Sequence, residues 1–262
     1  MKSRTVCLSF DFEEFDLPRE HGVDFPIEKG MPVSIAGAEA VLDVLRRQGV
    51  HATIFSTLNF AERAPGIVRR ILEEGHELAA HGVDHFRQAP DDPRRSKEGL
   101  EKLSGRTILG YRQPRMFPVS DEELKACGYK YNSSLNPAFI PGRYAHFATP
   151  RRPFLKAGLL QIPASVVPFV RFPLFWLSLH LLPLRLYTAL VRLTLRWDGH
   201  FVTYFHPWEF FPGLAEHPEW KIPWLIRRNA GSPLADRLER FIVALKRSGA
   251  TFSTLAQSGL VR

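Results

Sequence analysis

The sequence contains little cysteine. Its 262 residues include two cysteines, Cys7 and Cys127, which are too few for a disulfide framework in a chain of this size. Their apolar surroundings predict that both are reduced thiols of the core. A secretory signal is also lacking, because acids begin at Asp11, before any long apolar run has formed. We therefore expect a cytoplasmic protein.

A membrane-spanning helix is absent as well. The most apolar and aromatic stretch, residues 166–197, is broken by three prolines and carries Arg171, Arg185, Arg192 and Arg196, whereas a span needs about 20 mainly apolar residues. Two interpretations are open. The segment is either a core helix with basic residues along its edge, or a monotopic surface whose apolar face inserts into an anionic membrane at the inner face of the cell.

The chain is basic, with a net charge of +8 and a pI of about 9.7. Such a surface favours anionic partners, whether phosphate groups, acidic lipids or nucleic acid. Hydrophobic residues make up 45% and charged residues 24%, as in ordinary globular proteins, which excludes a disordered or fibrous chain. The basic residues are spread along the sequence and no nucleic-acid-binding module is recognisable, so we expect no nucleic-acid partner.

Short apolar runs alternate with amphipathic patterns over most of the chain. Strands are predicted at residues 6–12, 52–60, 77–81, 107–113, 129–134, 200–210 and 250–255, and helices at residues 34–48, 64–74, 91–104, 121–127 and 233–246. Ser34 and Ser232 are suitable N-caps for two of the helices. Such alternation implies a parallel sheet. The number of units favours a (β/α) barrel, whose chemistry takes place at the C-terminal ends of the strands.

The first predicted strand ends in the acidic motif DFEE, residues 11–14. Alternate residues of a strand face the same side, so Asp11 and Glu13 share a side opposite to Phe12. Two neighbouring carboxylates are costly to hold together unless a cation compensates them. The motif therefore fits a metal site, although a solvated acidic turn is the simpler explanation of the motif alone.

Two histidines, His81 and His85, follow the third predicted strand. On a helical turn their spacing of four directs both imidazoles to one face, where they can bind one metal ion. Imidazole suits zinc and its first-row neighbours. With one carboxylate the set has three protein ligands, which leaves a position for water and is typical of catalytic rather than structural sites. Two unrelated surface histidines are the alternative.

Two further motifs end later strands. Arg112, in GYRQPR, could hold Asp11 by charge-assisted hydrogen bonds, or could form an ordinary surface ion pair. His206, in YFHPWE, has apolar neighbours and could act as a general acid near neutral pH. Taken alone, His206 would be interpreted as a satisfied core histidine.

In this order the motifs resemble the polysaccharide deacetylase family, which is defined by NodB homology and is also called carbohydrate esterase family four. The resemblance extends from Val6 to about Leu255 and is nearest to a branch with the motifs S-F-D-x-E-[DE] and F-H-P-W-E. It implies a distorted (β/α)₇ barrel. We expect a single catalytic domain, residues 1–262, in which residues 166–197 are an apolar and basic insertion.

The resemblance also implies roles for individual residues. Asp11 corresponds to the catalytic base, Arg112 to the arginine that orients the base, and His206 to the catalytic acid. His81 and His85 correspond to metal-binding histidines. The expected cofactor is a divalent metal, with zinc preferred and cobalt, nickel, manganese and iron as alternatives. The expected substrate-binding residues are Pro114, Arg115, Asn132 and Trp208.

Three positions depart from the family pattern. Phe12 stands where many members have the metal-binding carboxylate, and strand alternation makes Glu13 the substitute ligand. Asn132 lies near the place of an aspartate that commonly tunes the acid histidine, and it carries no charge. Arg115 replaces the usual aromatic residue, which suggests an anionic substrate.

The function implied is hydrolysis of the N-acetyl group of an amino sugar, in a polysaccharide or a lipid-linked glycan precursor. One alternative is deformylation of a polyprenyl-phosphate-linked amino sugar, which a cytoplasmic location and the basic segment at 166–197 would suit. Another alternative is a catalytically inactive protein that binds glycans or lipids. The intact set of motif residues argues against this last interpretation.

Overall fold

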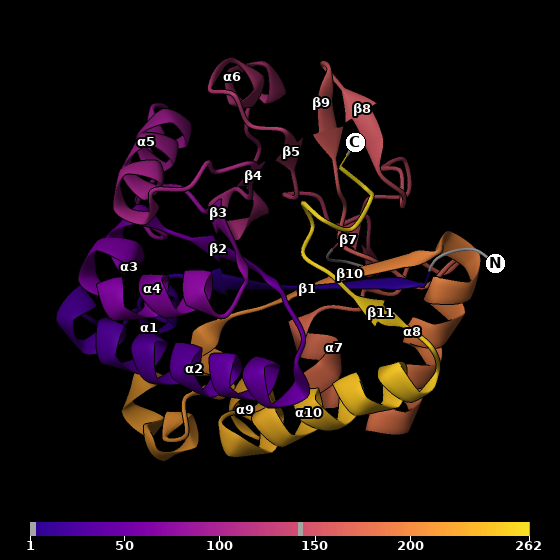
Figure 1. The fold of residues 1–262 in the computed structure, drawn as a ribbon. Coiled ribbons are helices and arrows are strands. Elements are labelled where there is room, and N and C mark those ends of the chain that lie inside the picture. The colour runs from indigo at the N-terminus through magenta and orange to yellow at the C-terminus, as the bar shows by residue number, and fades with distance from the viewer. Residues whose placement is uncertain (1–3, 141–143, 262) are drawn as a thin grey trace.

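The computed structural model describes residues 4–140 and 144–261, which form one curved sheet surrounded by helices (Figure 1). Within these residues the strands follow the order β10-β1-β2-β3-β4-β5-β9-β8, and β11 pairs with β1. The strands of this sheet are β1 (Thr5–Phe12), β2 (Thr53–Ser56), β3 (Glu77–Ala80), β4 (Gly110–Tyr111), β5 (Tyr131–Asn132), β8 (Phe154–Lys156), β9 (Leu159–Gln161), β10 (His200–Phe205) and β11 (Thr251–Phe252). In a separate two-stranded sheet, β6 (Phe139–Ile140) pairs antiparallel with β7 (Tyr144–Ala145).

From β10 to β9 each described strand is parallel to the next one in this order, whereas the edge strand β8 is antiparallel to β9. This arrangement confirms the distorted (β/α)₇ barrel in a single domain. Within the described chain the barrel is open between β9 and β10, which do not pair as strands. Ser165, shortly after β9, bridges this gap. Its amide donates to the carbonyl of Val202 at 2.8 Å, and its hydroxyl accepts from the amide of Val202 at 2.9 Å.

β1 lies between β10 and β2, and each of its residues is buried. Phe10 pairs in register with Phe205 on one side and Ile54 on the other. Parallel strands that are covered on both faces are usually apolar throughout. Asp11 at the end of β1 is therefore a polar exception, placed where the strands of a barrel present their chemistry.

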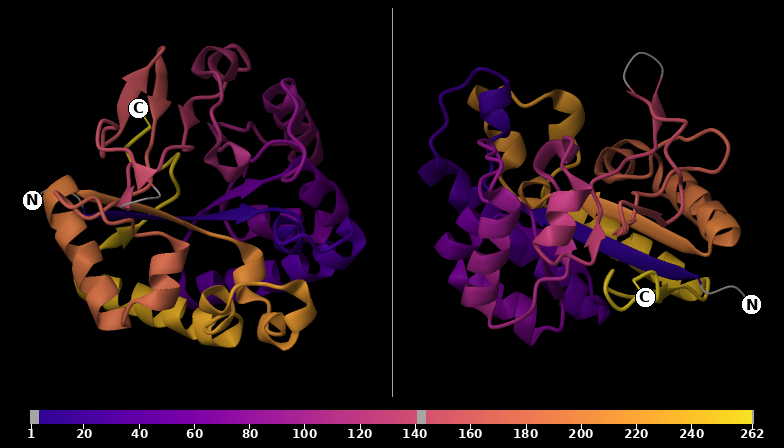
Figure 2. Two further views of the ribbon diagram at one scale, coloured as in Figure 1. Left: turned by 180° about the vertical axis from the view of Figure 1, so that it is seen from behind. Right: turned by 90° about the horizontal axis from the view of Figure 1, so that it is seen from above.

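Helices cover the outside of the sheet, as the views from behind and above show (Figure 2). They are α1 (Leu17–Glu20), α2 (Ile27–Gln48), α3 (Leu58–Arg63), α4 (Pro65–Glu73), α5 (Asp92–Ser104), α6 (Asp121–Ala126), α7 (Trp176–Leu181), α8 (Leu184–Asp198), α9 (Trp224–Arg227) and α10 (Ser232–Arg247). Short 3₁₀ turns include η1 (Pro114–Met116) and η2 (Pro207–Phe210). Cys7 is buried, Cys127 is half-buried, and both thiols are free.

Several predicted boundaries were wrong. α2 begins at Ile27, so Ser34 is a buried residue inside the helix rather than its N-cap. Pro32 is the sixth residue of α2, and the helix continues past it although proline lacks the N–H that would donate to the carbonyl of Glu28. The strand predicted at 52–60 ends at Ser56, because the hydroxyl of Thr57 caps α3 by accepting from the amide of Phe60 at 3.1 Å. Gly231, rather than Ser232, precedes α10.

Two glycines on one face of α2 allow the helix to approach two loops very closely. A Cβ atom at Gly30 would overlap the carbonyl oxygen of Phe15, and a Cβ atom at Gly37 would overlap the carbonyl oxygen of Pro207. Residues seven apart lie on the same side of a helix. α2 therefore packs directly against both the loop after β1 and η2, which follows β10.

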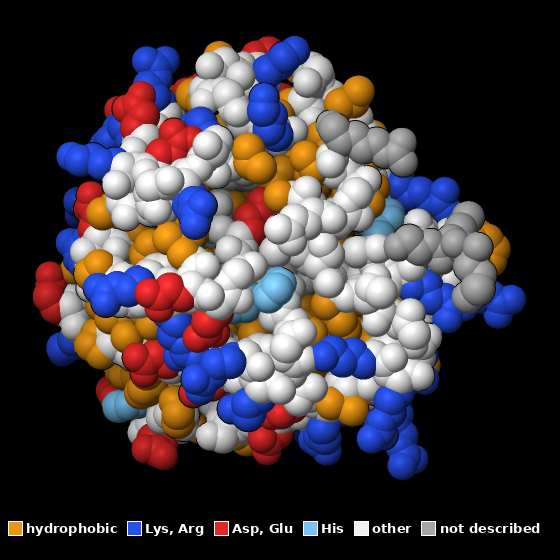
Figure 3. Space-filling view, viewed as in Figure 1, with side chains coloured by type: hydrophobic (Ala, Val, Ile, Leu, Met, Phe, Trp, Pro, Cys, Tyr) orange, Lys and Arg blue, Asp and Glu red, His pale blue; other side chains and the backbone are white. Residues whose placement is uncertain are grey.

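The segment 166–197 forms α7, most of α8 and the loop before them. α8 buries Tyr187, Val191 and Leu195, so one face of the segment belongs to the core. Its opposite face exposes arginines and large apolar residues, namely Arg185, Leu186, Arg192, Leu193, Arg196 and Trp197. In Figure 3, Lys and Arg prevail on the right, around α8, whereas Asp and Glu gather mainly on the left. None of the helices in the described ranges is long and apolar enough to cross a membrane.

Candidate active site

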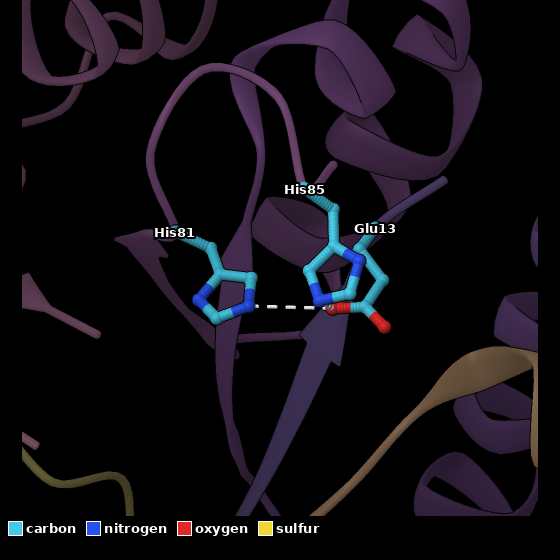
Figure 4. Close-up of side chains that lie close together, drawn as sticks. All are labelled: Glu13, His81 and His85. Atoms are coloured by element: carbon cyan, nitrogen blue, oxygen red, sulfur yellow. Dashed lines mark ion pairs between the residues drawn. The ribbon is translucent and has the colours of Figure 1, made fainter. Parts of the chain in front are cut away.

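Three side chains converge at the carboxyl ends of β1 and β3. Glu13 follows β1, His81 follows β3, and His85 lies on the loop after it. The Nε2 atoms of His81 and His85 lie 3.3 and 3.2 Å from the Oε2 atom of Glu13. Figure 4 shows both imidazoles directed at this carboxylate. All three side chains are buried, and one ligand atom from each lies within 4.8 Å of the others. The structure thus brings together the three residues predicted as metal ligands.

The hydrogen bonds of the two histidines determine which ring nitrogen faces Glu13. The Nδ1 atom of His81 lies 2.8 Å from the carbonyl oxygen of Arg112, and that of His85 lies 3.0 Å from a carboxylate oxygen of Asp16. Both partners are acceptors, so each Nδ1 donates a proton. In the neutral rings this leaves the lone pair on Nε2, the arrangement that metal-binding histidines require.

The charges of this cluster fit a divalent cation. The Oε2 atom of Glu13 is buried, and no described residue forms a hydrogen bond with it. A buried carboxylate oxygen without a donor is costly unless a positive charge compensates it. Burial opposes the charging of His85, but Glu13 and Asp16 outweigh burial and raise its pKa to about 9. A metal would replace that proton, because ligands bind metals in their deprotonated form.

Glu14, the neighbouring acid, turns away from the histidines. Its Oε2 atom accepts a hydrogen bond from the hydroxyl of Thr57 at 2.8 Å. Burial raises the pKa of Glu14, although the Thr57 hydrogen bond opposes this shift. Phe12 points into the core on the side opposite to Glu13, as strand alternation predicted.

The histidines do not lie on a helical turn, which corrects that part of the expectation. His81 and His85 belong to an irregular loop, and their rings stack with centroids 5.9 Å apart. Gly82 breaks any helix there because its φ is +72°, in the left-handed region that favours glycine. A Cβ atom at Gly82 would also lie only 3.2 Å from the ring of Pro114. A tight turn of the loop therefore directs both imidazoles to one side, as the period of a helix would have done.

Asp11 and Arg112 form a buried ion pair, as predicted. The Nη1 atom of Arg112 lies 2.5 Å from Oδ1 of Asp11, and the arginine side chain is fully buried. Ser133 fixes the rest of the guanidinium, accepting from Nε through its carbonyl at 3.0 Å and from Nη2 through its hydroxyl at 3.1 Å. Burial alone would raise the pKa of Asp11, but Arg112, together with His81 and His206, lowers it. Asp11 is thus ionised at neutral pH.

His206 lies at the end of β10 and is held by a carboxylate that sequence reasoning missed. Its Nδ1 atom lies 2.8 Å from Oε1 of Glu209, which also accepts from the amide of His206 at 2.6 Å. The other oxygen of Glu209 lies 2.9 Å from Nε2 of His180 in α7. Burial alone would raise the pKa of Glu209, but hydrogen bonds from His180 and His206 lower it. The acid three residues after His206 was the available signal for Glu209, whereas nothing in the sequence indicated His180.

Trp208 contacts both Glu13 and His206. Its indole Nε1 donates to Oε1 of Glu13 at 3.3 Å, and its ring stacks on that of His206 with centroids 5.2 Å apart. Burial disfavours the charged form of His206, but Glu13, Glu209 and Asp11 outweigh burial and raise its pKa. The predicted base, acid and metal ligands therefore share one electrostatic environment at the same edge of the sheet.

Three residues predicted to bind substrate have protein partners. Arg115 pairs with Glu20, and its Nη2 atom lies 3.0 Å from Oδ2 of Asp16. The Asn132 side chain donates to Asp121 at 3.1 Å and accepts from the amide of Ser134 at the same distance. Pro114 is buried against the histidine loop. Asn132 thus supports the loop that holds Arg112, and Glu209 supplies the charge beside His206.

The comparison with known families agrees with this geometry. The family described as polysaccharide deacetylase matches residues 28–131, a range that contains His81, His85 and Arg112 and leaves out Asp11, Glu13 and His206. The chain is 29% identical over 125 residues to a peptidoglycan deacetylase of Helicobacter pylori, a match that covers 44% of this chain and 43% of that protein. It is 47% identical over 45 residues to a peptidoglycan-N-acetylglucosamine deacetylase of Listeria monocytogenes, covering 17% of this chain and 10% of that one. The chain therefore matches less than half the length of these curated relatives.

Solved structures share the fold over nearly the whole chain. A family 4 carbohydrate esterase from Bacillus anthracis is 16% identical, with a TM-score of 0.52 over 100% of this chain and 84% of that one. A family 4 pseudoenzyme from the same organism is 12% identical, with a TM-score of 0.53 over 98% of this chain and 65% of that one. At such identities the likeness shows the fold alone, and active and inactive members share it. The chain thus matches the polysaccharide deacetylase family over residues 28–131, less than half of its length, and shares the fold of family 4 carbohydrate esterases.

Proposed function

We propose that this protein is a metal-dependent hydrolase that removes the acetyl group from the nitrogen of an amino sugar. The observation that carries the proposal is the convergence of an ionised Asp11, a Glu13–His81–His85 cluster and a histidine acid, His206, at one edge of the sheet. Amide hydrolysis needs a base, an electrophile and an acid together. We propose residues 1–262 as the catalytic unit, with 166–197 as its insertion.

Zinc is the metal that we propose, held by Glu13, His81 and His85. Two imidazoles and one carboxylate form the donor set of many catalytic zinc sites, with cobalt, nickel, manganese and iron as chemical alternatives. When bound, such an ion lowers the pKa of water and polarises the acetamide carbonyl. The Nδ1 atom of His81 donates to the carbonyl oxygen of Arg112, and the Nδ1 atom of His85 donates to the carboxylate of Asp16. These hydrogen bonds hold both rings in the orientation that metal ligation requires.

Asp11 acts as the general base in this proposal. Arg112 keeps it ionised and fixes its position, so the free carboxylate oxygen can take a proton from the attacking water. His206 acts as the general acid and delivers a proton to the leaving nitrogen, because an amide anion is too basic to depart unaided. The raised pKa of His206 keeps this proton available at neutral pH.

The loop at η1 is proposed to stabilise charge on the carbonyl oxygen. Arg115 and Met116 have φ values of +57° and +52°, a left-handed backbone conformation that is unfavourable for residues other than glycine. Such conformations cluster at functional sites, where backbone N–H groups need a particular direction. We assign the main-chain N–H near Arg115 to the oxyanion. The guanidinium of Arg115 pairs with Asp16 and Glu20. The Arg115 side chain therefore offers little net charge to an anionic substrate.

The proposed substrate is an amino-sugar glycan, either a polymer or a lipid-linked precursor. The relatives named for peptidoglycan support an N-acetylglucosamine unit. Trp208 and the tethered Arg115 border the site and are proposed to contact the sugar, together with Pro114. The proposed location is the cytoplasm, including the inner face of the membrane.

An anionic membrane is proposed as a peripheral partner of the insertion. Phe169 and Trp197 are 71% and 46% exposed and lie in contact, with ring centroids 5.0 Å apart. Arginines of α8 flank them, and arginine binds lipid phosphate well. Trp197 precedes β10 and His206 follows it, so about 20 Å separates them at the usual rise per strand residue. At that distance the proposed contact would hold the protein at the membrane rather than place a lipid anchor beside His206.

Mass spectrometry tests the function. The metal-loaded protein is incubated with N-acetylated and N-formylated amino-sugar glycans, both free and lipid-linked. We expect a loss of about 42 mass units from N-acetyl substrates, whereas deformylation would give about 28, by metal-assisted hydrolysis. A His206→Ala control should show neither loss. Intact substrates with the wild-type, metal-loaded protein would contradict the proposal and leave the inactive binding protein as the better explanation.

Vesicle co-sedimentation tests the membrane contact. Wild type should sediment with anionic vesicles at low salt and less so at high salt, because salt screens the arginines. Trp197→Ser should weaken binding, whereas Trp224→Ser, which removes a 61% exposed tryptophan from α9, should not. Wild type that stays in the supernatant at low salt would rule out the membrane role.

A further inference from the structure

His206 has a second histidine behind it, reached through one carboxylate. Glu209 is fully buried and bridges the two rings, with Nδ1 of His206 at 2.8 Å from one oxygen and Nε2 of His180 at 2.9 Å from the other. His180 is itself fully buried. Charge-assisted hydrogen bonds of this length are strong and directional. The three side chains therefore form one connected network.

The network fixes the direction of each proton. Glu209 is an acceptor at both oxygens, so Nδ1 of His206 donates to it, and Nε2 of His206 is the atom left to face a substrate. On the far side, Nε2 of His180 donates to Glu209. Nδ1 of His180 is buried and forms no hydrogen bond with any described residue. That favours the ring with its single proton on Nε2, because a second buried N–H would lack an acceptor.

Aromatic rings hold the network in place. Trp176, at the start of α7, contacts the rings of both His180 and His206 edge-on, with centroids 5.9 and 5.5 Å apart. Asn229 donates to the carbonyl of His180 through its side chain. Trp176 and His180 both belong to the insertion, residues 166–197, which therefore supplies one wall of the acid's environment.

We propose that His180 and Glu209 are positioning residues for the acid step, and that α7 of the insertion completes the active site. Glu209 orients His206 and stabilises its protonated form. His180 keeps Glu209 in place, because without that donor one oxygen of a fully buried carboxylate would lose its hydrogen bond. The inference rests on the proposed deacetylase function, in which His206 protonates the leaving nitrogen.

The choice of leaving group separates this role from a structural one. An amine leaves only when it is protonated, whereas the phenolate of 4-nitrophenyl acetate leaves without a proton. His180→Leu and Glu209→Gln should therefore lower kcat for an N-acetylglucosamine oligomer, by about 10-fold or more, as expected for loss of part of a general acid contribution of about 10²–10⁴-fold. KM, metal content and ester hydrolysis should change little.

Two controls sharpen the test. His180→Gln keeps a donor for Glu209 and should retain most of the amide activity. His200→Leu removes a buried imidazole at the other end of β10, where its Nδ1 lies 3.1 Å from the carbonyl of Asp198, and should leave the ratio of amide to ester activity unchanged. Equal loss on both substrates in His180→Leu, or wild-type amide turnover in that variant, would overturn the proposal.

A spectroscopic measurement makes the inference independent of turnover. A nitrogen-edited proton spectrum of the metal-loaded protein should show the Nδ1–H of His206 shifted downfield by its bond to Glu209. Glu209→Gln should abolish that shift and His180→Leu should reduce it, with His200→Leu as the unchanged control. If the resonance does not move in His180→Leu, the positioning role is wrong even when the wild type is an active deacetylase. If the resonance moves but wild type hydrolyses no acetamide, the network exists and the proposed function fails.

Discussion

The site has two sides that are built differently. The metal side consists of the proposed ligands Glu13, His81 and His85, which follow β1 and β3, two strands separated by β2, at the same edge of the sheet. The acid side consists of His206 and Glu209, which follow β10, together with His180 from the insertion. Strand ends place the first set by sheet register, whereas the second depends on how a helix packs against the barrel. A motif confined to strand ends is therefore readable in a sequence, while one that needs a helix contact is not.

The largest expected effect is on the metal side. The double change His81→Ala, His85→Ala removes both imidazoles directed at Glu13, so binding of a divalent ion and activity should both be lost. Elemental analysis and amide turnover measure these losses. Unchanged metal content would show that the ion, if any, lies elsewhere.

A related change distinguishes the two acids of the same motif. Glu13→Ala should lower metal content more than Glu14→Ala does, because Glu14 accepts from Thr57 instead of facing the histidines. Both variants lose one carboxylate from adjacent positions, which makes them a matched pair. The reverse order would assign the ligand to Glu14.

Asp11→Asn should leave the metal in place and reduce kcat by about 10²–10⁴-fold, since an amide cannot accept the proton of water. Arg112 would keep its two hydrogen bonds to Ser133, one to the carbonyl and one to the hydroxyl, so the fold should survive. Circular dichroism, metal content and turnover check this prediction together. Near-normal turnover would exclude Asp11 as the base.

A smaller effect, on stability, should come from α2, the helix that packs against the loop after β1 and against η2. Gly37→Ala places a methyl group against the carbonyl of Pro207, so we expect a loss of about 1–3 kcal/mol in the free energy of unfolding from overpacking. Gly66→Ala, in α4, meets no atom within 4 Å and should be neutral or stabilising by up to about 1 kcal/mol. Denaturant unfolding compares the two. Equal stabilities would show that η2 can move away from α2 freely.

The smallest effect expected is a change in pH dependence on the acid side. In the proposed mechanism activity requires protonated His206, whose pKa is raised above its ordinary value, so activity should fall as pH rises through that raised value. The charged groups that face His206 are Asp11, Glu13 and Glu209. Glu209→Gln removes one of these negative charges, which should move the high-pH limb of kcat/KM to lower pH. An unmoved limb would mean that Glu209 does not affect the acid.

Sequence reasoning predicted the barrel and the placement of Asp11, Glu13 and Arg112 because the period of a strand is a local property, and the parallel strands of a barrel present their carboxyl ends at one edge. It misjudged the histidine loop, since the period of a helix and a glycine turn can both direct His81 and His85 inward. Periodicity also gave no sign of the short helix α1, whose Glu20 neutralises Arg115.

The acid side shows why the remainder could not be predicted. His180 and Glu209 are 29 residues apart in sequence, and their contact depends on α7 packing against η2. The insertion was interpreted from its composition, as a core helix or a membrane surface. Its inner face does belong to the core, but a composition argument cannot indicate that one histidine on it reaches a buried carboxylate.

The glycine face of α2 sets a limit on length variation in this chain. Gly30 and Gly37 contact the loop after β1 and η2, which carry the metal side and the acid side respectively. Inserting or deleting one residue between them would rotate one glycine by about 100° around the helix and bring a larger side chain against one of the two loops. Insertions within residues 31–36 should therefore be excluded among functional variants.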